Sequence, residues 1–133
     1  LAMMLDESLI APVLSQPSLP VGPLPSQKRG LHVSDETLRQ IRTRSADKDI
    51  PVMALRFTAD PLCPRERFES LRQNFGSRLR AIEIDSKPGN PHGIVPWAHS
   101  VLTEHLVDRD GHPTQEALRE VLAFFDERLR PGA

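Results

Sequence analysis

The feature that most constrains the fold is an almost continuous apolar run from Pro51 to Thr58, interrupted only by Arg56. A strand of this kind needs cover on both faces, as strands in parallel sheets have. An alternating pattern from Leu79 to Asp85 predicts a second strand. Residues 10–15 predict a short third strand, although Pro12 cannot donate to a ladder.

Helix signals fall between these strands. Residues 35–46 predict a helix that is capped by Ser34. A second helix is expected to begin at Pro64, because proline suits the first helical position. Thr114 is expected to cap a final helix, and residues 101–107 slightly favour a helix over a strand. The inward face of the final helix is expected to carry Leu118, Val121, Leu122, Phe125 and Leu129, and the helix to end at Pro131-Gly132.

Strands that alternate with helices indicate an α/β fold with a mostly parallel sheet of about three strands. Three strands are few for such a sheet. Leu1 to Leu5 resemble the last turns of a helix that begins upstream, and 13 prolines are many for 133 residues. Residues 17–33 form a Pro-rich connection that is expected to be extended and non-helical through Leu31. Residues 1–133 are therefore expected to form one partial domain of a larger protein.

Composition excludes several classes of function. The net charge is −1, with 17 basic and 18 acidic residues, so no basic field exists to bind nucleic acid. No apolar run approaches the length of a membrane span. The single cysteine, Cys63, excludes an internal disulfide framework and a multi-cysteine zinc site. No signal-peptide pattern is present at the first residues, and we expect a cytoplasmic location.

Two ionisable residues follow the predicted strands. Asp60 lies two residues past the strand that ends near Thr58, and His92 lies seven residues past Asp85. Ligands bind outside the carboxyl ends of parallel strands, and consecutive strands joined by one helix are usually neighbours. Alone, Asp60 would be interpreted as a turn residue and His92 as a surface residue. Together they predict a carboxylate that orients an imidazole base.

Other residues compete for these roles. His99, His105 and His112 follow His92 at intervals of seven, six and seven residues, which do not match metal-ligand spacing. A metal-dependent enzyme is therefore the poorest interpretation. Cys63 stands at the start of a predicted helix, where a thiolate would be favoured, but a small buried side chain is the better interpretation. No Gly-x-Ser-x-Gly sequence occurs, so the chain lacks a recognisable triad nucleophile.

The segment from Arg56 to Pro64, Arg-Phe-Thr-Ala-Asp-Pro-Leu-Cys-Pro, resembles the loop that delivers the triad Asp in α/β-hydrolases. The segment Asn-Pro-His-Gly-Ile at 90–94 resembles the loop that delivers the triad His, with Ile94 in the usual aromatic place. Within that superfamily the chain is most similar to the dienelactone hydrolase family. The resemblance spans all 133 residues, but it covers only the C-terminal half of such a protein.

This resemblance implies a hydrolase of esters or lactones that uses a nucleophile–His–Asp triad. Asp60 and His92 would be its catalytic residues, with His99 as the alternative base. The nucleophile, Cys or Ser, would lie upstream of Leu1, so this chain alone is expected to be inactive. The resemblance implies a small-molecule ester or lactone substrate, and no cofactor, metal, nucleic acid or membrane partner. The competing interpretation is a non-catalytic α/β-hydrolase-like binding domain or an inactive fragment.

Overall fold

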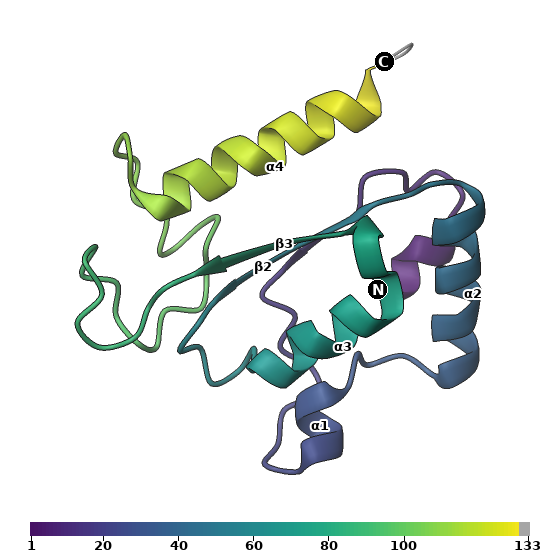
Figure 1. Ribbon diagram of the computed structural model, residues 1–133, viewed down its shortest axis with the longest axis horizontal. Helices are drawn as coiled ribbons and strands as arrows, with labels where there is room; N and C mark the ends of the chain where they lie inside the picture. The colour runs from purple at the N-terminus through teal and green to yellow at the C-terminus, as the bar shows by residue number, and fades with distance from the viewer. Residues whose placement is uncertain (131–133) are drawn as a thin grey trace.

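The computed structural model describes residues 1–130 and shows an open sheet of three parallel strands, with helices on both faces (Figure 1). The strands lie in the order β1 (Val13–Ser15), β2 (Val52–Phe57) and β3 (Leu79–Ile84). This confirms the α/β class and the parallel sheet. The helical elements are η1 (Ala2–Leu5), α1 (Pro25–Arg29), α2 (Asp35–Asp47), α3 (Arg65–Phe75), η2 (Gly76–Arg78) and α4 (Pro113–Leu129).

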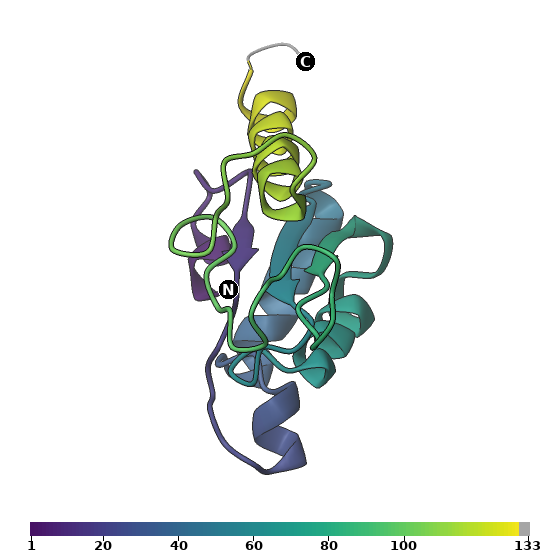
Figure 2. The same cartoon turned by 90° about the vertical axis from the view of Figure 1, so that its left-hand side faces the viewer.

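The central strand β2 is buried along its whole length, as its apolar run predicts. Met53, Leu55 and Phe57 face one hydrophobic cluster, to which α4 contributes. Val52 and Ala54 face a second cluster, which α2, α3 and η1 cover. Figure 2 shows α4 on one side of the sheet and the other helices across from it. A two-sided core of this kind explains why β2 has almost no polar residue.

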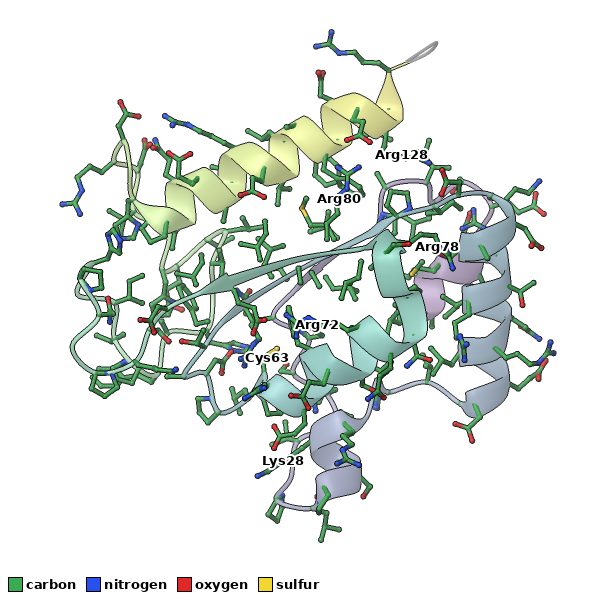
Figure 3. All side chains as sticks on the ribbon, in the orientation of Figure 1. Lys28, Cys63, Arg72, Arg78, Arg80 and Arg128 are labelled. Carbon is green, nitrogen blue, oxygen red and sulfur yellow. The ribbon has the colours of Figure 1, made fainter. Side chains whose placement is uncertain are left out.

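The one charged residue of β2 is held by an ion pair with the neighbouring strand. Arg56 is 3% exposed, and its Nε donates to Oε2 of Glu83 at 2.7 Å. Arg72, which reaches from α3 toward the sheet in Figure 3, bonds to the other oxygen of Glu83. Burial acts to raise the pKa of Glu83, but the hydrogen bonds from Arg72 and Arg56 outweigh it and lower this pKa. The pair therefore compensates a charge that would otherwise be costly to bury.

Several local predictions need correction. The first strand begins at Val13 instead of Ile10, because Pro12 has no N–H to contribute to the ladder. The connection 17–33 is not wholly extended, since its Pro25 opens the short helix α1. Residues 101–107 form turns instead of a helix, and Leu1 to Leu5 form a single 3₁₀ turn.

The final helix also differs from its prediction. Its cap is His112, not Thr114. The face that packs on the sheet is rotated by about one position, so Leu122 and Leu129 are 57% and 56% exposed. The stripe that packs on the sheet shares only Val121 with the expected face. That buried stripe consists of Thr114, Ala117, Val121 and Phe124.

Pro131 and Gly132, which were expected to end this helix, lie outside the described residues. None of the helices within residues 1–130 has the length and apolar character needed to cross a membrane.

Candidate functional site: a buried carboxylate and an imidazole at the carboxyl ends of the strands

The carboxyl ends of β2 and β3 are joined by three hydrogen bonds. The backbone N–H of Thr58 donates to the carbonyl of Ile84 at 2.9 Å, which continues the ladder by one residue. Beyond it, the Ser86 hydroxyl accepts from the N–H of Ala59 at 3.0 Å, and the Thr58 hydroxyl accepts from the N–H of Ser86 at 3.1 Å. Ser86 is fully buried. These reciprocal bonds fix where the chain leaves each strand.

Asp60 is held firmly at this edge. It is 3% exposed, and its Oδ1 accepts from the backbone N–H of Leu62 at 2.8 Å. This is the local bond by which Asp stabilises a turn. The second carboxylate oxygen, Oδ2, faces the long loop formed by residues 85–112, drawn in green beside the strand ends in Figure 1. One oxygen therefore serves the turn, and the other is available to a partner.

The partner of Asp60 is His99. Nδ1 of His99 lies 2.6 Å from Oδ2 of Asp60. Because an ionised carboxylate only accepts hydrogen bonds, this contact assigns the proton to Nδ1 and leaves Nε2 as an acceptor in the neutral ring. The Asp60 side chain is fully buried, whereas the His99 side chain is 35% exposed. The pair thus combines a shielded carboxylate with a ring that solvent or a substrate can reach.

His92 lies elsewhere, which corrects the expectation that Asp60 orients it. Residues 87–94 form a compact turn that is closed by Asn90. The Asn90 side-chain amide donates to the carbonyl of Ile94 at 2.6 Å and accepts from the N–H of Ile94 at 3.0 Å. The exposed His92 ring packs edge-on against His112, with centroids 5.5 Å apart. The chain comes back to the sheet edge only after this turn, at His99.

The return of the loop is driven by apolar burial. Ala98 and Val101, on either side of His99, are both fully buried in the cluster beneath α4. The His105 ring packs against Phe57 at 6.1 Å, and its Nδ1 accepts from the N–H of Ser100 at 3.3 Å. Burying Ala98 and Val101 anchors the backbone at both ends of the short segment that carries His99.

His112 has a structural role. It is 2% exposed, and its Nδ1 accepts from the N–H of Thr114, capping α4. Burial, followed by the charges of His92 and Arg109, lowers the pKa of His112. A lowered pKa favours the neutral ring, which is the form that can accept this capping bond. His112 is therefore a helix cap.

Cys63 is close to Asp60 in sequence but is chemically quiet. It is fully buried, and Figure 3 shows it in the interior beside the start of α3. Burial, with the nearby Asp60 charge, raises the pKa of its thiol to about 12. The thiolate is the reactive form of cysteine, so this position does not supply a nucleophile at neutral pH.

This yields a first prediction. Alkylation of Cys63 by iodoacetamide at pH 8 should be at least about a hundredfold slower in the folded protein than in guanidinium chloride, because the folded thiol is buried and protonated. Peptide mass spectrometry would locate the label, and Cys63→Ala would identify the unlabelled background. Equal rates in the two conditions would contradict the burial of this thiol.

Three residues of this edge carried no signal in the sequence. Thr58 and Ser86 resemble ordinary polar residues at strand ends. Gln16, whose side chain contacts the loop at His99 and Val101, falls between the predicted strand 10–15 and the Pro-rich connection 17–33. Residues 1–130 contain no group of three or more His, Cys, Asp or Glu side chains that could hold a metal ion.

Comparisons with protein-family models, with curated proteins and with solved structures gave no match to this chain.

Proposed function

We propose that this chain supplies the acid and the base of a nucleophile–His–Asp triad in a hydrolase that cleaves esters or lactones. The observation that carries the proposal is the 2.6 Å contact between Oδ2 of the buried Asp60 and Nδ1 of His99. A buried carboxylate in this position holds the imidazole in one tautomer and stabilises the imidazolium that forms when the ring takes a proton. The base is therefore His99, in place of His92.

The nucleophile, a Cys or Ser, is proposed to lie upstream of Leu1. Support comes from the order of the sheet. β1 is an edge strand: it pairs with β2 on one side, and no strand of the described residues pairs with β1 on the other side. A further parallel strand added at that edge would end on the same side as Asp60 and His99. A nucleophile on the turn after such a strand could then approach Nε2 of His99.

In the proposed reaction, Nε2 of His99 removes the proton of the nucleophile as it attacks the substrate carbonyl carbon. The resulting tetrahedral intermediate collapses to an acyl-enzyme, and the His99 imidazolium gives its proton to the departing alkoxide. His99 then takes a proton from water as the water oxygen attacks the acyl carbon. The His99 imidazolium returns that proton to the departing nucleophile when the second tetrahedral intermediate collapses and the acid is released. Asp60 stays ionised throughout, and backbone N–H groups upstream would bind the oxyanion.

The test is Asp60→Asn in the full-length protein that carries the proposed nucleophile. Loss of the carboxylate should lower kcat for p-nitrophenyl acetate by about 10³- to 10⁴-fold, because the wrong tautomer of His99 is then favoured. The matched control is Asp85→Asn. Asp85 follows the neighbouring strand and bonds to Thr58 at 3.1 Å, but it does not contact His99.

We expect the Asp85→Asn variant to keep turnover within about twofold of the original. An intact protein that hydrolyses neither esters nor lactones, or an Asp60→Asn variant with full turnover, would contradict the proposal. The first outcome would favour a non-catalytic binding domain. A fluorophosphonate or iodoacetamide label that depends on His99 would locate the upstream nucleophile as Ser or Cys.

A further inference from the structure

Gln16 occupies an unusual position beside the Asp60–His99 pair. It follows the last residue of β1 and is 6% exposed. Its φ of 43° places it in the left-handed region, which is uncommon for a residue other than glycine. Its backbone N–H donates to the carbonyl of Leu55 at 2.9 Å, so the end of β1 is fixed to the central strand. The backbone from which the Gln16 side chain extends is therefore held in place.

The Gln16 amide contacts the backbone on both sides of Ser100. In the orientation that satisfies its partners, the amide nitrogen donates to the carbonyl of His99 at 3.2 Å, and the amide oxygen accepts from the N–H of Val101 at 2.9 Å. The nitrogen also lies 2.5 Å from the hydroxyl of Ser15. One side chain thus pairs with a donor and an acceptor of the loop, as a neighbouring strand would.

Through these contacts the loop that carries His99 is bound to the ends of two adjacent strands, β1 through Gln16 and β2 through Asp60. His99 lies on a long loop, and its side chain hydrogen-bonds to Asp60 in the turn that follows β2. Gln16 holds the same loop from β1. A carboxylate and an imidazole that must share one hydrogen bond need their backbones fixed to a fraction of an ångström, and a misplacement of about 1 Å can cost about a hundredfold in rate.

We infer that Gln16 is a positioning residue, whose side-chain amide clamps the backbone at His99 and Val101 so that the imidazole stays aligned with Asp60. The role in catalysis rests on the proposed function, but the clamp itself is a property of the fold. The inference predicts that losing the amide loosens the Asp60–His99 contact without removing either partner.

The experiment uses Gln16→Met and Gln16→Asn in the intact protein. Met has a similar length but no hydrogen-bonding amide, whereas Asn tolerates the left-handed backbone but is one methylene shorter and cannot reach both groups. NMR of histidine-labelled protein reports the Nδ1–H that His99 shares with Asp60 and the tautomer of the ring. The control is Gln40→Met, because Gln40 lies exposed on α2 and bonds only to Glu36.

Both Gln16 variants should lose or broaden the His99 Nδ1–H resonance and lower kcat by about tenfold to a hundredfold, with KM within about twofold. Gln40→Met should change neither. An unchanged resonance and kcat in both variants, or a change in KM alone, would overturn the inference and leave the proposed function standing. Loss of the resonance in a protein without hydrolase activity would support the clamp and overturn the proposed function.

Discussion

On the proposed hydrolase mechanism, replacing His99 by Gln should reduce ester hydrolysis about 10⁴-fold or more, whereas His92→Gln should leave it within about twofold. The two histidines lie on the same loop, so the pair of variants tests position and not merely the presence of an imidazole. Gln keeps much of the polar shape of His but cannot take a proton at neutral pH. The measurement is kcat and kcat/KM for a p-nitrophenyl ester and for a small lactone.

The physical reason for this difference is contact with the buried carboxylate. His99 Nδ1 lies 2.6 Å from Asp60, whereas the exposed His92 packs on His112. Thermal unfolding of both variants provides the control for folding, and we expect similar melting temperatures because neither side chain is buried in the core. Full activity in His99→Gln, with loss in His92→Gln, would move the base to His92 and would require the loop to rearrange.

The largest expected effect on stability is at Arg67. Its side chain is 1% exposed, and its five N–H groups donate to five backbone carbonyls at 2.6–3.0 Å. Four of these acceptors, on Pro17, Pro20, Gln27 and Gly30, belong to the Pro-rich connection. The fifth belongs to Leu62, next to the Asp60 turn. Arg67 therefore holds the connection against the start of α3.

Arg67→Met should lower the free energy of unfolding by about 3 kcal/mol or more, because several carbonyls lose a charged donor at once. Arg67→Lys should recover only part of this loss, since an ammonium group has three donors instead of five. Urea unfolding measures the change, and limited proteolysis should show faster cleavage within residues 17–33.

The matched control is Arg65→Met. Arg65 lies on the same helix, but its side chain is 78% exposed and pairs only with Glu69 in the next turn. Its replacement should change the free energy of unfolding by no more than about 0.5 kcal/mol. A similarly small change in Arg67→Met would show that the connection is held by its other contacts.

Local chemistry explains which elements could be predicted. Ser34 accepts from the N–H of Thr37 at 3.1 Å and begins α2 as expected. Gly76 ends α3 with a φ of 54°, which the absence of a side chain permits. These signals act over a few residues, so the helix ends that they set do not depend on the tertiary packing. The turns at residues 101–107 and the inward face of α4 depend on distant partners. No helix forms at 101–107, and on α4 Val121 is buried as expected whereas Leu122 and Leu129 are exposed.

The sequence by itself determined the parallel α/β architecture and the place of Asp60. The apolar run of β2 requires cover on both faces, and Asp60 lies so close to the end of that strand that it could only fall at the carboxyl edge of the sheet. Only the tertiary structure decided which histidine meets it. Four histidines share the loop 85–112. His99 meets Asp60 where Ala98 and Val101 are buried and where the Gln16 amide bonds to the loop backbone, contacts between residues far apart in the chain.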